Sequence, residues 1–233
     1  MRIKNSPYNL IESLGYLKRN TFGPVSKNRG IVAYCPQSCE IKSGIRPDYK
    51  LGFIGDIMDM GGRNLIIGEN IKAFISDCDY LIGNFEATIT DLKGPPFSQK
   101  HIPQILDALE TLFPPSRTFL SLANNHSGDF GFEIWSRSKA MIEEKGFQVF
   151  GTADKPYVEI DNKIRVVGAT NWSNQPVDYI FRLDDAKALS QVGMFNILYP
   201  HWSYEMELFP RPGFVKQGMD FSHVVPPAFA VII

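Results

Sequence analysis

TFLSLANNHSGDFG, residues 118–131, is the stretch that decides the fold. Its first part, Thr118 to Leu122, is a short and mostly apolar run, which predicts a buried strand. The polar residues Asn124, Asn125 and His126 follow directly. A helical pattern then runs from Phe132 to Lys145 and stops at Gly146, the residue type that most often ends a helix. The stretch therefore predicts a strand, a polar turn and a helix in succession.

The same alternation recurs on both sides of this stretch. Short apolar runs end in polar or glycine-rich turns and are followed by helical patterns, as in βαβ units. A hairpin is also expected, in which Asp161-Asn162 joins two short strands. The remaining expected strands are Leu51 to Ile54, Tyr80 to Ile82, Val158 to Ile160, Lys163 to Val167 and Phe195 to Tyr199. The remaining expected helices are Asn64 to Ser76 (with Ile67, Ile71, Phe74 and Ile75 on one face), Pro103 to Leu112 and Leu183 to Val192. We therefore expect an α/β fold.

The alternation begins near Tyr49, so we expect residues 49–233 to form the functional domain. Residues 1–48 contain scattered Gly, Pro, Ser and Asn with weak periodicity, apart from a short helical pattern from Tyr8 to Lys18. We expect this segment to be an N-terminal appendage, and its sequence indicates no role for it.

Composition limits the class of protein. A chain of 233 residues with 44% hydrophobic and 21% charged residues is typical of one soluble domain. The net charge of −1, without any lysine or arginine run longer than a dipeptide, argues against nucleic acid as a partner. Because no run of about 18 apolar residues is present, we expect no membrane span, no export signal and a cytoplasmic location.

Three cysteines, Cys35, Cys39 and Cys78, are an odd number at spacings that match neither a zinc site nor a disulfide framework. We expect free thiols. Pairing of Cys35 with Cys39 under oxidation stays open.

Polar residues follow the expected strands at the point where each strand ends. Loops beyond the carboxyl ends of strands converge on the ligand crevice in open α/β sheets, so residues far apart in sequence can meet there. The residues in question are Asp56, Glu86, Asn125, His126 and His201. Carboxylates, an amide oxygen and imidazoles are also the ligands of Mn, Mg, Zn or Fe. The sequence therefore predicts one polar site that holds one or two divalent ions.

Each of these residues has a simpler interpretation. Asp56 and the neighbouring Asp59 suit turns and helix caps, and Glu86 suits a solvated position. The Asn124-Asn125 dipeptide suits a turn, and a single histidine such as His126 is more often structural than a ligand. His201, followed by Trp202 and Tyr204, suits a packed aromatic corner. The functional interpretation rests on their shared position at strand ends.

Four segments resemble the successive motifs of the CapA family, the bacterial capsule and poly-γ-glutamate synthesis proteins. They are Gly55-Asp56-Ile57-Met58, Asn84-Phe85-Glu86, Ala123 to Gly131, and His201-Trp202-Ser203-Tyr204-Glu205. The order and spacing are similar over residues 51–219, and the Asn124 to Gly131 stretch is the most specific. The resemblance implies a calcineurin-like phosphoesterase fold, with four layers of helix, sheet, sheet and helix and a metal site on one edge. Members of this family are often anchored to the membrane and located outside the cytoplasm.

The same resemblance implies roles for individual residues. Asp56 takes the first metal position, Asn84 or Glu86 the bridging position, and Asn125 and His126 the asparagine-histidine motif. His201 takes the fourth position. His126, placed near a leaving group as a general acid, and His201 are the candidate catalytic residues. In the wider superfamily two metal ions polarise a phosphoryl oxygen and activate water.

The chain also departs from that pattern. Met58 stands where phosphoesterases of this fold have a histidine, and Asn84 stands in place of an aspartate. After Asp220, His223 is the only candidate for the last histidine motif, and we give it as a further metal ligand. We therefore expect a sheet that is incomplete at its carboxyl end, with an exposed edge that favours a homo-oligomer.

Two functions remain as hypotheses. One is a metal-dependent hydrolase or transferase that acts on an anionic polymer such as poly-γ-glutamate, or on a phosphorylated small molecule. The other is a non-catalytic binding or accessory protein that keeps the fold and the polar pocket. An inactive fragment is the third and simplest possibility.

Overall fold

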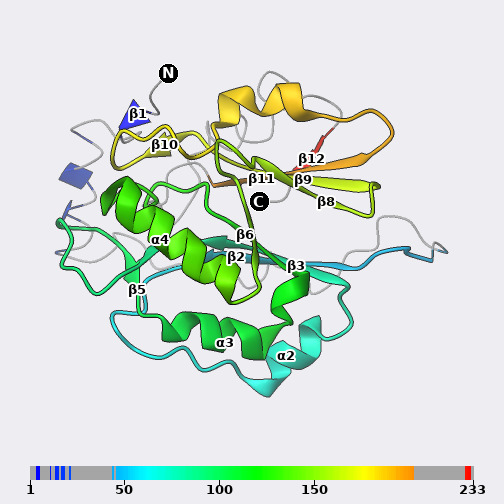
Figure 1. Cartoon of the computed structure of the whole chain (residues 1–233), viewed down its shortest axis with the longest axis horizontal. Coiled ribbons are helices and arrows are strands. Elements are labelled where there is room, and N and C mark those ends of the chain that lie inside the picture. Colours follow the sequence, from blue (N-terminus) through cyan, green and yellow to red (C-terminus); the bar gives the residue numbers. More distant parts are fainter. Residues whose placement is uncertain are drawn as a thin grey trace.

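The computed structural model describes residues 46–201, Gly44, strand residues 4–5 and 229–231, and several positions between residues 11 and 21. Within this part of the chain, two four-stranded sheets form the centre of the molecule, and helices lie on their outer sides (Figure 1). The α/β fold class expected from the sequence is confirmed.

The first sheet is entirely parallel, in the order β2-β3-β6-β7. Its strands are β2 (Leu51–Ile57), β3 (Tyr80–Phe85), β6 (Thr118–Ser121) and β7 (Gln148–Phe150). Parallel strands need crossovers, and helices supply them: α2 (Glu69–Ile75), α3 (Gln104–Leu112) and α4 (Gly131–Glu144). All four strands therefore end at the same edge of the sheet.

The second sheet is mixed, in the order β12-β11-β9-β8. The strands β8 (Tyr157–Ile160) and β9 (Ile164–Thr170) form the expected antiparallel hairpin, and Asp161 and Asn162 in its turn have left-handed φ angles of 50° and 54°. The strand β11 (Phe195–His201) runs parallel to β9. Beside β11, at the carboxyl end where the sequence predicts an incomplete sheet, the strand β12 (Phe229–Val231) pairs in parallel.

Apolar side chains fill the space between the two sheets and the space under the helices. Ile82 and Phe119 of the first sheet pack against Val166 and Ile197 of the second in one buried cluster. A second cluster joins the other face of the first sheet to α3 and α4. The helix α3 contributes Ile105, Leu106 and Leu109, and burial of each such side chain stabilises the fold by roughly 1.5–3 kcal/mol.

The helix α2 differs from its expected form. It begins at Glu69 rather than Asn64, after Gly68, which makes no side-chain cap. Ile71 and Phe74 were expected to face the core, yet both are exposed, and Phe74 has 80% of its surface in solvent. Only Ile75 of this helix is buried, so the apolar stripe in the sequence does not mark a packed face.

The segment expected as a helix from Leu183 to Val192 also differs, since it is the 3₁₀ helix η3 (Leu183–Leu189). Short elements complete the described part: β1 (Lys4–Asn5), β4 (Thr88–Ile89), β5 (Lys100–His101), η2 (Pro115–Arg117) and β10 (Trp172–Ser173). In the short helix expected from Tyr8 to Lys18, the described positions are helical and the others lie outside the described residues.

Two further expectations concern thiols and membranes. Cys78 is a free thiol, whereas Cys35 and Cys39 lie outside the described residues. In the part of the chain that the structure describes, no helix is long and apolar enough to cross a membrane.

Candidate metal centre

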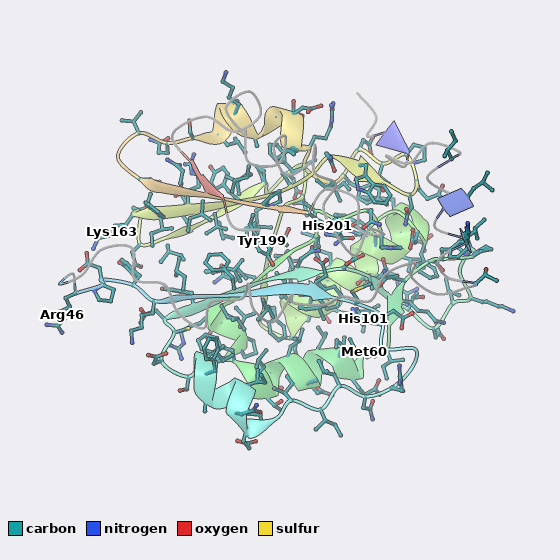
Figure 2. The ribbon with its side chains drawn as sticks, turned by 180° about the vertical axis from the view of Figure 1, so that it is seen from behind. Arg46, Met60, His101, Lys163, Tyr199 and His201 are labelled. Carbon is teal, nitrogen blue, oxygen red and sulfur yellow. The ribbon has the colours of Figure 1, made fainter. Side chains whose placement is uncertain are left out.

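The polar residues at the strand ends come together at one edge of the two sheets. Asp56 is the second-last residue of β2, Glu86 follows β3 directly, and Asn125 and His126 follow β6. His201 is the last residue of β11 and reaches the same place from the second sheet (Figure 2). This convergence follows from the parallel strands, whose carboxyl ends share one edge.

A β-bulge determines which face of β2 carries Asp56. Phe53 pairs with Ile82 and Asp56 pairs with Asn84, so β2 has one extra residue between these pairs. Phe53 faces the second sheet. Simple alternation would turn Asp56 towards the helices, because successive strand residues point to opposite faces. The extra residue returns Asp56 to the face where His201 lies.

Asp56, Glu86 and His201, called the ligand triad below, each offer one donor atom, and these atoms all lie within 4.8 Å of one another. Glu86 is 1% exposed, which excludes the alternative that its side chain points into solvent. One carboxylate oxygen of Glu86 lies within 4.8 Å of one of Asp56. Two carboxyl groups at such distance repel each other when both are ionised, and a cation or a shared proton relieves that repulsion.

Asp56 is predisposed to be ionised. Burial acts to raise the pKa of its carboxyl, but hydrogen bonds with His201 and Asn84 and the charge of His201 outweigh burial and hold that pKa below its ordinary value. The side chain of Asp56 keeps 39% of its surface in solvent. The triad therefore has one side open to a ligand.

Amide side chains fix the ring of His201. Its Nε2 donates to Asn125 Oδ1 over 2.7 Å, because an amide oxygen only accepts. The other ring nitrogen, Nδ1, faces Asp56 Oδ1 at 3.2 Å and Asn84 Nδ2 at 3.0 Å. A lone pair on Nδ1 opposite a carboxylate oxygen is unfavourable unless a proton or a metal ion lies between them. The donor types and their arrangement thus fit a divalent ion such as Mn, Zn, Fe or Mg.

Asn84 takes part as a hydrogen-bond donor. Its Nδ2 lies 2.6 Å from Asp56 Oδ1, and its Oδ1 accepts from Asn124 Nδ2 over 3.3 Å. Asn124 also donates to the Phe85 carbonyl and accepts from the His126 backbone N–H. Asn84 therefore directs its nitrogen, and not its oxygen, towards the triad.

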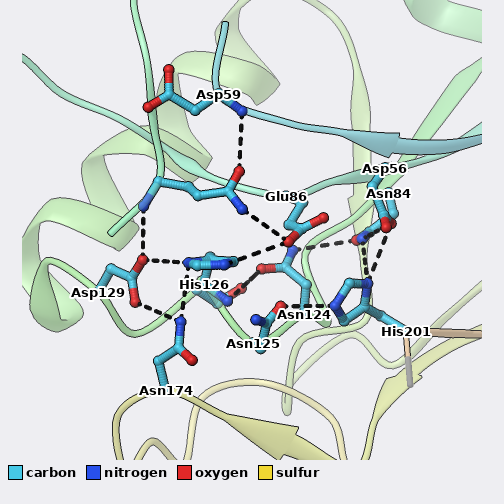
Figure 3. A network of polar contacts seen from close by, with 12 residues as sticks. Asp56, Asp59, Asn84, Glu86, Asn124, Asn125, His126, Asp129, Asn174 and His201 are labelled. Carbon is cyan, nitrogen blue, oxygen red and sulfur yellow. Dashed lines mark hydrogen bonds and ion pairs between the residues drawn. The ribbon is translucent and has the colours of Figure 1, made fainter. Parts of the chain in front are cut away.

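His126 lies on the other side of Glu86 (Figure 3). Its Nδ1 donates to Asp129 Oδ2 over 2.6 Å, and its Nε2 is 3.6 Å from Glu86 Oε1. Asn174 Nδ2 is near both Nδ1 and Asp129 Oδ1, and we assign its hydrogen bond to the carboxylate, which only accepts. His126 and Asp129 are both buried, so the ring is held with Nε2 towards Glu86.

Gln99, Asp129 and Asn174 were not among the residues predicted for the site. Gln99 accepts from the Asp59 backbone N–H through Oε1, donates to Glu86 through Nε2, and donates to Asp129 through its backbone N–H. The sequence could have indicated Asp129, because it lies three residues after His126 in the same motif. Gln99 and Asn174 lie in loops, and no sequence pattern marks them.

Two described residues named from the sequence, Asp59 and Met58, are not members of the triad. Asp59 caps a turn, as its Oδ1 accepts from the Gly61 N–H over 2.6 Å. Met58 is largely exposed. His223 lies outside the described residues, as do Trp202 and Tyr204.

The fold and this edge together define a class: an α/β protein with two carboxylates and an imidazole, groups able to hold a metal ion, at the carboxyl ends of its strands. The family model of the bacterial capsule synthesis protein PGA_cap matches residues 50–213, and the chain belongs to this family. The resemblance drawn from the four motifs is thereby confirmed. A comparison with curated proteins gave no match.

Proposed function

We propose that this member of the capsule synthesis family is a metal-dependent hydrolase or transferase, and that its ion is held by the ligand triad. The observation that carries the proposal is the approach of two carboxyl groups and one imidazole to within 4.8 Å, from three strand ends in two sheets. When bound, a divalent ion supplies Lewis-acid polarisation of a substrate oxygen.

The residues around the triad have separate tasks in this proposal. Asp56, Glu86 and His201 hold the ion. Asn125 fixes the His201 ring through its 2.7 Å contact with Nε2 and leaves Nδ1 for the triad. Metal-bound histidines usually donate their second N–H to such a partner, which sets both tautomer and orientation.

His126 is the proton-transfer residue. Asp129 holds Nδ1, so Nε2 is the atom that gives a proton to a leaving group or takes one from a nucleophile. Its 3.6 Å separation from Glu86 places that atom beside the triad. Catalysis then needs both His126 and His201, the first for the proton and the second for the ion.

The fold we propose is the four-layer arrangement of helix, sheet, sheet and helix, formed by residues 49–233. Its support is the apolar cluster between the two sheets, with α2 and α3 beyond the first sheet and η3 beyond the second (Figure 1). The proposed substrate is an anionic polymer such as poly-γ-glutamate, or a phosphorylated small molecule. Family membership supports a role in capsule synthesis.

A non-catalytic binding or accessory role is the alternative, and one observation favours it. Asn84, at the position where the family pattern suggests a bridging ligand, directs its nitrogen towards Asp56 and His201. Within the described residues a single group of three ligands forms, and the exposed Met58 adds no ligand that hard ions favour. One ion, held without turnover, suits such a role.

Metal content and turnover test the two functions together. Purified protein is analysed for Mn, Zn and Fe, stripped with chelator and titrated with Mn²⁺ and Zn²⁺ by calorimetry, beside Asp56→Ala and the control Asp77→Ala. Asp77 is an exposed carboxylate paired with Lys50, so its loss leaves the triad intact. We expect binding by the wild type and the control only. Equal binding by Asp56→Ala contradicts the proposed site.

Turnover is measured on phosphomonoester, phosphodiester and γ-glutamyl amide substrates with the loaded protein. Activity that is lost in His126→Ala and His201→Ala supports the enzyme. Metal binding without any activity supports the accessory protein instead.

A further inference from the structure

The bulge in β2 is tied to the second sheet by one side chain. The interrupted part of the β2–β3 ladder contains Ile54 and Gly55, between the pairs made by Phe53 and Asp56. The hydroxyl of Tyr199, from β11, donates a hydrogen bond to the backbone carbonyl of Ile54. This contact crosses the space between the sheets at the point where β2 gains its extra residue.

Tyr199 is well placed to hold this geometry. It lies two residues before His201 on β11, so both side chains leave the same face of the strand (Figure 2). Its ring is buried in the cluster between the sheets, with its centroid 5.9 Å from that of Phe53.

We propose that Tyr199 is a positioning residue that sets Asp56 opposite His201 by holding the β2 bulge. The inference rests on the proposed metal function, which gives the position of Asp56 its consequence. One strand, β11, then carries both a ligand of the triad and the hydroxyl that places another ligand. The two sheets are thereby locked together at the site.

The chemistry explains why a tyrosine is needed rather than another apolar residue. The phenyl ring fills the core between the sheets, as phenylalanine also would. The hydroxyl, which phenylalanine lacks, donates to the part-buried Ile54 carbonyl, and the loss of such a hydrogen bond is costly. In Tyr199→Phe we expect the bulge to relax, and Asp56 to lose its fixed distance from His201.

The test compares Tyr199→Phe with Tyr80→Phe in the full chain. Tyr80 is the matched control, because its ring packs in the same cluster against Phe119 and lies on β3, away from the bulge. Co²⁺ is titrated and its visible spectrum recorded, since this spectrum reports the geometry of the ligands. Orienting partners of metal ligands are usually worth roughly 10- to 100-fold in affinity, and we expect a loss of this size with a changed spectrum in Tyr199→Phe only.

Hydrogen–deuterium exchange of the peptide that covers residues 51–57 measures the bulge without any metal. Faster exchange in Tyr199→Phe than in Tyr80→Phe supports the proposal. An unchanged Co²⁺ affinity and spectrum in Tyr199→Phe overturns it, even when exchange is faster. An unfolded Tyr199→Phe chain beside a folded Tyr80→Phe chain also overturns it, because a positioning residue leaves the fold intact.

Failure of the proposed function gives a different result. If the wild type and Tyr80→Phe also fail to bind Co²⁺, the proposed metal-dependent function is contradicted. The exchange experiment then decides alone: faster exchange still supports Tyr199 as the residue that holds the bulge, and unchanged exchange overturns it.

Discussion

The ligand triad and the His126–Asp129 pair lie side by side, but they are held in opposite ways. The triad draws one residue from each of three strand ends, and its carboxyl groups face each other. The His126–Asp129 pair comes from one loop, and its two members satisfy each other over 2.6 Å. The triad therefore requires the whole fold, whereas the pair requires only a local turn.

In the proposed function this difference separates two chemical tasks. A group of like-charged ligands binds an ion because binding removes their repulsion. An imidazole held by a carboxylate keeps a defined tautomer and transfers a proton at its other nitrogen. Glu86 connects the two, since it belongs to the triad and lies 3.6 Å from His126 Nε2. Variants on each side should therefore fail in different measurements.

The largest effect is expected for His126→Gln. The change removes the proton-transfer group, so kcat on the best substrate should fall by about 10²- to 10⁴-fold. Mn²⁺ affinity by calorimetry should stay within a few-fold of the wild type, because His126 lies outside the triad. A collapse of Mn²⁺ affinity would place His126 among the ligands and remove the distinction between the two groups.

Glu86→Gln should have the opposite profile. The change keeps the size of a fully buried side chain but removes a charge from the triad, so Mn²⁺ affinity should fall by more than the roughly 10- to 100-fold typical of orienting partners. The control is Glu133→Gln, an exposed residue in the first turn of α4. Equal Mn²⁺ affinity in wild type and Glu86→Gln, measured by the same titration, contradicts the assignment of Glu86 as a ligand.

Asp129→Asn should show a smaller effect of the same kind as His126→Gln. The imidazole remains, but the amide no longer offers two acceptor oxygens to His126 and Asn174. We expect kcat to fall on the order of 10- to 100-fold while Mn²⁺ affinity is kept. A loss as large as that of His126→Gln would mean that the pair acts as one unit.

Sequence alone predicted the members of the triad better than their arrangement. Asp56, Glu86 and His201 could be named because parallel strands share one carboxyl edge, a rule that needs only the order of strands. The face on which Asp56 lies could not be predicted. Alternation along β2 points it at the helices, and the bulge that corrects this has no signature in the apolar pattern.

Loop residues and surface helices also limited what the sequence could predict. Gln99 reaches Asp59, Glu86 and Asp129 from a loop without periodicity, so only tertiary structure places it. In α2 the apolar spacing of Ile71 and Phe74 is helical, but no element of the described part covers these side chains. Periodicity predicts the element, and packing partners decide which face is buried.

The smallest expected effect concerns His101, a buried histidine outside both groups. Its Nε2 is 3.0 Å from the Ile57 carbonyl, and its ring packs on Phe85. Burial lowers the pKa of His101 below its ordinary value of 6.5. Between the folded and unfolded pKa values the unfolded chain binds more protons. The contribution of neutral His101 to the free energy of unfolding is therefore complete above pH 6.5 and is lost as the pH falls below it.

His101→Gln tests whether this histidine belongs to the fold rather than to the site. Glutamine keeps an N–H for the Ile57 carbonyl and does not titrate, but it loses the ring contact, which costs about 1 kcal/mol. Urea unfolding at pH 8 and pH 5.5 should show a smaller loss of stability with acid in the variant than in the wild type. The wild-type chain is the control, because every other ionisable group is present in both proteins. Equal losses, or a change in Mn²⁺ affinity, would contradict a purely structural role and extend the metal centre to β5.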